Sequence, residues 1–112
     1  MSELSEQHCR ALTSDSPALS KEDSEKYLVQ LDNGWGLSAD GKTISRSFKF
    51  SNYYETMAFA NVAAMIAHQQ DHHPEMTISY NYCLVTYTTH SISGLSINDF
   101  ICAAKTDNAL CL

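Results

Sequence analysis

Alternation of apolar and polar side chains is the feature that most limits how this chain can fold. Residues 43–50 read TISRSFKF, which places Ile44 and Phe48 on one side and mainly polar residues on the other. Residues 76–82 and 83–89 alternate in the same way. A period of two predicts β-strands, and one polar face per strand predicts an antiparallel sheet that is buried on one side only.

Two segments beside these strands carry helical signals. Residues 54–71 contain no Gly or Pro and form a broad apolar stripe. They predict the longest helix, which should stop before Pro74 because a proline disfavours helical geometry in the residue ahead of it. Ser20 begins a pattern similar to a capping box, and the helix that it opens should end at the turn 32–34, where Gly34 suits a left-handed C-terminal position.

A third helix and a short first strand complete the predicted order. Ser96 with Asp99 three residues later is a second capping-box pattern, and the strand 35–37 precedes an Asp-Gly turn at Asp40. We therefore expect an α+β fold, in which a four-stranded antiparallel sheet carries three helices on one face in the order α-β-β-α-β-β-α.

Length and charge limit the domain organisation and the partners. The chain has 112 residues, enough for one domain. We expect residues 1–19 to be a flexible or loosely docked arm and residues 20–112 to be the single domain. The net charge of -6 argues against binding to nucleic acid or to an anionic membrane. No transmembrane stretch or signal peptide is visible, which favours a cytoplasmic protein with its four cysteines reduced.

The histidines are the chemically informative residues. Three of the five lie within residues 68–73, at the expected end of the long helix, and His90 lies at the expected end of the last strand. Each alone is most simply a polar residue at the end of an element. Together they suit proton transfer or metal binding, since imidazole titrates near neutral pH. His68 and His72 are four residues apart, so a metal site with His90 as third ligand is an alternative.

The spacing of these residues resembles the signature of a known family. Over 32 residues the chain carries, in order, His68, His72, His73, Pro74, Tyr80, His90 and Asp99. The intervals are similar to those of the pterin-4a-carbinolamine dehydratases, also known as the dimerization cofactor of a homeodomain transcription factor. Trp35 ahead of an Asp-Gly-Lys hairpin, the Phe-Lys-Phe strand and the segment 94–96 also resemble bacterial members.

The resemblance implies a fold of the same order and a specific activity. Family members dehydrate 4a-hydroxytetrahydrobiopterin (pterin-4a-carbinolamine) to quinonoid dihydrobiopterin and water, which recycles the cofactor of aromatic amino acid hydroxylases. The pterin is the substrate, and no metal or organic cofactor is implied. The implied partners are further copies of the chain, in a dimer or tetramer, and a pterin-dependent phenylalanine hydroxylase. A non-catalytic dimerization or binding module is the alternative.

The resemblance also assigns site residues. His72, His73 and His90 would be catalytic, with His72 and His90 as the acid/base pair in an unspecified order and His73 as a positioning group. The substrate-binding residues would be His68, Asp71, Thr88, Thr89 and Asp99.

Four residues of the motif have features that bear on these roles. Asp99 is also placed to cap a helix, and Tyr80 lies on the apolar side of its predicted strand, which favours a place in the core. At the position of His68 many relatives have an acid. Strict alternation would turn His90 away from the buried face, unless the strand ends first or contains a bulge.

Overall fold

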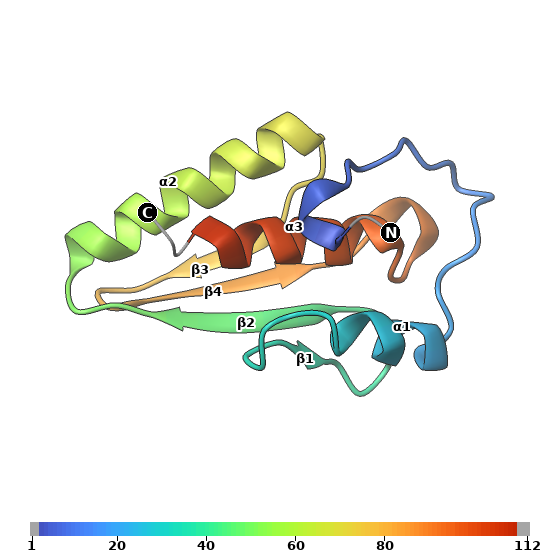
Figure 1. The fold of residues 1–112 in the computed structure, drawn as a ribbon, viewed down its shortest axis with the longest axis horizontal. Helices are drawn as coiled ribbons and strands as arrows, with labels where there is room; N and C mark the ends of the chain where they lie inside the picture. Colours follow the sequence, from blue (N-terminus) through green and yellow to red (C-terminus); the bar gives the residue numbers. More distant parts are fainter. Residues whose placement is uncertain (1–2, 110–112) are drawn as a thin grey trace.

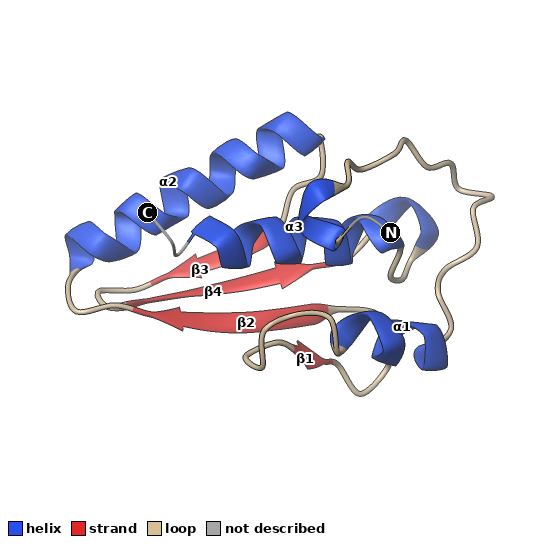
Figure 2. Ribbon diagram, viewed as in Figure 1, coloured by secondary structure: helices blue, strands red, loops and turns tan. Residues whose placement is uncertain are grey.

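A computed structural model describes residues 3–109 of the protein. Four antiparallel strands form one sheet in the order β1-β2-β4-β3 (Figures 1 and 2). The elements are, in chain order, the 3-10 helix η1 (Leu4–Glu6), α1 (Lys21–Leu28), β1 (Gly36–Leu37), β2 (Ile44–Lys49), α2 (Tyr53–Gln70), β3 (Glu75–Ile78), β4 (Tyr82–Tyr87), the 3-10 helix η2 (His90–Ile92) and α3 (Ile97–Asn108). The predicted fold class and the order of helices and strands are confirmed.

The core lies on one face of the sheet. In β2 and β4 the side chains that point to this face are almost fully buried: Ile44, Phe48, Cys83, Val85 and Tyr87. They meet apolar residues of α2 and α3, among them Phe59 and Phe100, and Tyr27 of α1 lies against Phe100. The alternation in the sequence therefore identified the buried side of both central strands, which pair in register from Ile44–Tyr87 to Lys49–Tyr82.

Local side-chain caps fix the ends of the two long helices. Asn52 accepts the first hydrogen bond of α2 from the backbone N–H of Glu55. α2 ends at Gln70, and Asp71 then adopts a left-handed conformation with φ of 50°. At the start of α3, Ser96 and Asp99 form the predicted capping box. The capping box depends only on neighbouring residues, which is why the sequence located the start of α3.

The end of the first helix was predicted wrongly. α1 stops at Leu28, and turn hydrogen bonds at residues 30 and 31 then bring Leu31 into the core. Gly34 is not left-handed. A Cβ atom at residue 34 would lie 2.5 Å from Nε of Arg46, so a larger residue there would displace this side chain of β2 from its present position.

The β3–β4 hairpin also differs from the sequence prediction. β3 ends at Ile78, and Tyr80 lies in the connecting turn with 63% of its surface exposed. The expectation that Tyr80 belongs to the core is therefore wrong. The alternating pattern continues past Ile78 into the turn, so alternation alone did not locate the end of β3.

Residues 3–19 run across α3 before entering α1 (Figure 1). Leu4 is buried, Lys105 donates to the backbone oxygen of Ser5, and the N–H of Leu19 donates to the oxygen of Leu95. The described residues do not include 1–2 or 110–112. Cys111, the first residues of the predicted arm and the last residues of the predicted domain therefore lie outside them.

A buried carboxylate joins α3 to the first strands. Asp107 accepts hydrogen bonds from the indole N–H of Trp35 at 2.8 Å and from Nη1 of Arg46 at 2.6 Å. Burial raises the pKa of Asp107, against the opposing effects of its hydrogen bonds and of Arg46. Arg46, the one charged residue on the buried face of β2, is thereby paired rather than left alone.

We predict that Asp107→Ala lowers the free energy of unfolding by about 2–4 kcal/mol, because it leaves the indole N–H of Trp35 without an acceptor and Arg46 without its buried partner. Urea unfolding followed by Trp35 fluorescence measures this loss. Asp32→Ala is the matched control: Asp32 also contacts Arg46, but its side chain is 63% exposed. The control should cost less than about 1 kcal/mol. Equal losses in the two variants would contradict the prediction.

Candidate active site

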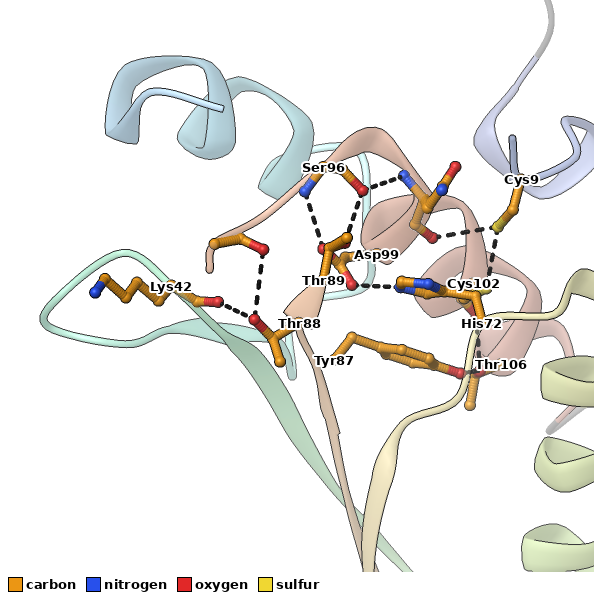
Figure 3. Close-up of polar contacts among 12 residues, drawn as sticks. Cys9, Lys42, His72, Tyr87, Thr88, Thr89, Ser96, Asp99, Cys102 and Thr106 are labelled. Atoms are coloured by element: carbon orange, nitrogen blue, oxygen red, sulfur yellow. Dashed lines mark hydrogen bonds and ion pairs between the residues drawn. The ribbon is translucent and has the colours of Figure 1, made fainter. Parts of the chain in front are cut away.

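The candidate active site is built around a histidine–carboxylate pair. His72 follows the left-handed Asp71 at the end of α2, and its Nε2 lies 2.6 Å from Oδ1 of Asp99 in the first turn of α3 (Figure 3). A carboxylate only accepts hydrogen bonds, so Nε2 carries the hydrogen and Nδ1 is the second ring nitrogen available to a ligand. The side chain of Asp99 is fully buried and that of His72 is 12% exposed.

The second oxygen of Asp99 is held by neighbouring elements. Oδ2 accepts from the hydroxyl of Thr89 at 2.8 Å and from the backbone N–H of Ser96 at 2.9 Å. Thr89 follows the end of β4, and its hydroxyl is also 2.8 Å from that of Ser96. The predicted capping role of Asp99 is thus confirmed, and the same carboxylate fixes the orientation of His72.

The surroundings of His72 favour its protonated form. Burial by itself would lower its pKa, but the hydrogen bond and the negative charge of Asp99 outweigh burial and raise the pKa above 6.5. The ring also lies parallel to that of Tyr87, with centroids 6.2 Å apart and 7° between the planes. The backbone of Tyr87 belongs to β4, and its hydroxyl is 2.8 Å from that of Thr106. The Tyr87 ring is therefore held at its backbone and at its hydroxyl.

A pocket of about 240 Å³ lies beside this pair. Its lining comes from the segment before α1, the end of α2, η2 with the residue ahead of it, and the start of α3: Arg10, Ala11, Leu12, Asp71, His72, Thr89, Ser91 and Asn98. Larger hollows of about 420 Å³ beside α1 and about 360 Å³ beside η1 are lined by no histidine. We therefore identify the pocket of about 240 Å³, which is lined by His72 of this pair, as the candidate site.

The pocket brings together some of the predicted site residues. Asp71, His72 and Thr89 line it, and Asp99 lies directly behind His72. The hydroxyl of Thr88 donates to the backbone oxygen of Lys42 at 2.6 Å, which holds the β1–β2 turn against the end of β4.

The other predicted histidines are exposed. His68 lies in the last turn of α2, His73 follows His72, and His90 begins η2 instead of ending a strand. β4 stops at Tyr87, so strand parity does not orient His90. The flanking Thr89 and Ser91 line the pocket, but His90 itself is not among its lining residues. The roles of these three histidines stay predictions.

The histidines do not form the alternative metal site. Within residues 3–109, no group of three His, Cys, Asp or Glu side chains is placed to hold a metal ion. His68, His72 and His90 therefore do not make a set of three ligands in this structure. In the same part of the chain, no helix is long and apolar enough to cross a lipid bilayer.

Several lining residues were not found from the sequence. Asn98 accepts from the N–H of Arg10 at 3.0 Å, and its amide donates to the oxygen of Arg10 at 2.7 Å. Asn98 stands next to the motif residue Asp99, which offered a weak signal. For Arg10 the sequence contained no signal. Arg10 and Asn98 are 88 positions apart, and a local sequence pattern does not predict a contact between such distant segments.

Comparisons with known proteins agree on one family. The family model described as Pterin 4 alpha carbinolamine dehydratase matches residues 17–109. A Nitrosomonas eutropha protein, provisionally named pterin-4-alpha-carbinolamine dehydratase, is 54% identical over 96% of this chain and 94% of its own length. A Legionella pneumophila protein with the same provisional name is 46% identical over 97% of this chain and 96% of its own length.

Solved structures share the fold. The crystal structure of a transcriptional coactivator/pterin dehydratase from Brucella melitensis matches with a TM-score of 0.78 and 35% identity, over 82% of this chain and 97% of that one. A pterin dehydratase-like protein identified as a RuBisCO assembly factor in the alpha-carboxysome matches with a TM-score of 0.61, over 70% of this chain and 90% of that one. Its 20% identity supports likeness of fold alone.

We predict that Asp99→Asn lowers the pKa of His72, because burial of the ring remains while the negative charge that opposes it most strongly is removed. A pH titration of the His72 ring signals by NMR measures the change. Asp71→Asn is the matched control, since the charge of Asp71 is the weakest of the contributions that raise the pKa of His72. A larger drop in the control than in Asp99→Asn would refute the assignment.

The same pair predicts how stability depends on pH. Because the pKa of His72 is higher in the folded chain, the protonated ring stabilises the fold fully below about pH 6.5, and this contribution is lost as the pH rises through the folded-state pKa. His72→Gln should therefore reduce the free energy of unfolding more at about pH 5.5 than at about pH 9. Chemical denaturation at both pH values tests this, and a loss independent of pH would be inconsistent with the pair.

Proposed function

The chain belongs to the pterin-4a-carbinolamine dehydratase family, and we propose that it dehydrates 4a-hydroxytetrahydrobiopterin to quinonoid dihydrobiopterin and water by histidine acid/base catalysis. The observation that carries the proposal is the pairing of His72 with the buried Asp99 at the wall of a pocket. The reaction would recycle the cofactor of an aromatic amino acid hydroxylase, with the pterin as substrate and no further cofactor.

The proposed chemistry needs two proton transfers. The hydroxyl at carbon 4a leaves as water only if its oxygen gains a proton, and a ring nitrogen must lose one as its electrons form the new double bond. Both transfers run best with groups whose pKa lies near the working pH, and each positioned group typically contributes about 10²–10⁴-fold in rate. Imidazoles meet this requirement at neutral pH.

We assign the acid role to His72. Asp99 holds Nε2 and raises the pKa of the ring, so protonation places the second hydrogen on Nδ1, the nitrogen not engaged by the carboxylate. That proton is the one offered to the leaving hydroxyl. Because Asp99 is itself fixed by Thr89 and Ser96, the ring is oriented before the substrate arrives.

We assign the complementary base role to His90. The backbone on either side of it borders the pocket through Thr89 and Ser91, and the ring is exposed at the start of η2. His73 would position the pterin, as would Asp71 through its carboxylate, which can accept from the amino-pyrimidine edge. His68 and Thr88 would act from the margin of the site.

We also propose that the protein works as a homo-oligomer, a dimer or tetramer. Ile78, Tyr80 and Tyr82 lie on edge strand β3, in its turn and at the start of β4, and they are 40%, 63% and 37% exposed. An apolar sheet edge of this kind is commonly covered by another chain. The same exposed edge at β3 would equally serve a non-catalytic dimerization or binding module, which is the competing function.

The test is a stopped-flow assay of the decay of 4a-hydroxytetrahydrobiopterin with the purified chain. We expect acceleration by the wild type, unchanged after treatment with a chelator, and a loss of about 10²–10⁴-fold in kcat for His72→Ala and for His90→Ala. His8→Gln is the control histidine variant, because it lies outside the pocket lining and keeps a polar group for its contact with Gln70.

Three outcomes would overturn parts of this proposal. A wild type that does not accelerate the decay would favour the binding module. An intact rate in His72→Ala would remove the acid role of His72, and an intact rate in His90→Ala would require a different base.

A further inference from the structure

Two cysteines from opposite ends of the chain meet beside the candidate site. The Sγ atoms of Cys9 and Cys102 are 3.4 Å apart although the residues are 93 positions apart (Figure 3). Both are free thiols in this structure. We propose that Cys9 and Cys102 are an oxidation site, at which a hydroperoxide converts the two thiols into a reversible disulfide that fastens the segment before α1 to α3.

The surroundings make the two thiols unequal. Cys9 is only partly buried, whereas Cys102 is fully buried in α3. The hydrogen bond from Cys102 lowers the pKa of Cys9, with further help from His72 and Lys105 against the opposing effects of burial and of the negative charge of Asp99. The same hydrogen bond and burial raise the pKa of Cys102. Cys9 is therefore the thiol that an oxidant reaches and that more readily forms the reactive thiolate.

The chemistry is a two-electron oxidation of the pair. The Cys9 thiolate attacks a hydroperoxide oxygen, so that an S–O bond forms, the O–O bond breaks and the leaving oxygen takes a proton. The sulfur of Cys102 then attacks the Cys9 sulfur. The S–S bond forms, the S–O bond breaks, and hydroxide leaves with the proton of Cys102 as water. Two thiols and one hydroperoxide thus give one disulfide, water and the alcohol, or a second water if the oxidant is hydrogen peroxide.

The geometry is close to that of the product. The sulfurs need to approach from 3.4 Å to about 2.05 Å. The segment that carries Cys9 is already held against both long helices: the N–H of Cys9 donates to Gln70 of α2 at 2.8 Å, and Arg10 is paired twice with Asn98 of α3. Neither cysteine belongs to a strand, since Cys102 lies in α3 and Cys9 lies between η1 and α1, so the link requires no rearrangement of the sheet.

The disulfide would secure one wall of the candidate pocket. Arg10, Ala11 and Leu12 follow Cys9 directly and line the pocket that contains His72. Oxidation would also prevent Cys9 from carrying the negative charge that, when the thiol is deprotonated, helps to raise the pKa of His72. An effect on dehydration would rest on the proposed function, but the formation of the disulfide does not.

The direct test is mass spectrometry of the full-length chain after incubation with hydrogen peroxide. We expect a monomer lighter by about 2 Da, the two hydrogens lost. Peptide mapping should join the peptides of Cys9 and Cys102, and dithiothreitol should restore the original mass. Cys9→Ser and Cys102→Ala should abolish the change, while Cys83→Ala, which alters another buried cysteine, should leave it intact.

A second measurement covers the case in which Cys102→Ala folds poorly. In the wild type, oxidation should raise the thermal midpoint by at least about 5 °C, because the link constrains nearly the whole unfolded chain. The partly buried Cys9→Ser variant should show no rise. Oxidation that stops at sulfinic acid on Cys9, a link that involves Cys83 or Cys111, or a link only between chains would each overturn the proposal, whatever the dehydratase assay shows.

Discussion

The buried carboxylate of Asp99 is the contact on which the arrangement of this protein depends. One oxygen accepts from His72 after the end of α2, and the other accepts from Thr89 beyond β4 and from the backbone of Ser96 ahead of α3. A fully buried charge costs several kcal/mol unless hydrogen bonds compensate for it. Asp99 satisfies this requirement by drawing the ends of three elements to one point, and that point borders the candidate site.

This arrangement explains how a small sheet with three helices can orient a histidine ring at the wall of a pocket. The ring of His72 is oriented from one side by Asp99 and lies parallel to Tyr87, which projects from the core face of β4 and is anchored to Thr106. The sheet and α3 therefore act as the rigid support, while the end of α2 supplies the histidine. The segment around Arg10 completes the pocket from a distant part of the sequence.

Particular elements show where the sequence was sufficient. The start of α3 was located from Ser96, because a cap acts within four residues. The buried faces of β2 and β4 followed from alternation. Tyr80 was misplaced, since a periodic pattern continues through a turn without marking it. The end of α1 was missed because Leu31 is drawn into the core by tertiary packing, which outweighs a favourable stop signal at Gly34.

The sequence by itself determined the fold class, the helix starts and the set of histidines, because these depend on periodicity, on capping and on intervals along one chain. Only the tertiary structure decided which histidine is held by a carboxylate, that η2 replaces the end of the last strand at His90, and that Cys9 lies against Cys102. These contacts join residues 27 and 93 positions apart or depend on where a strand stops pairing. They are fixed by packing across the core, which no local pattern in the sequence records.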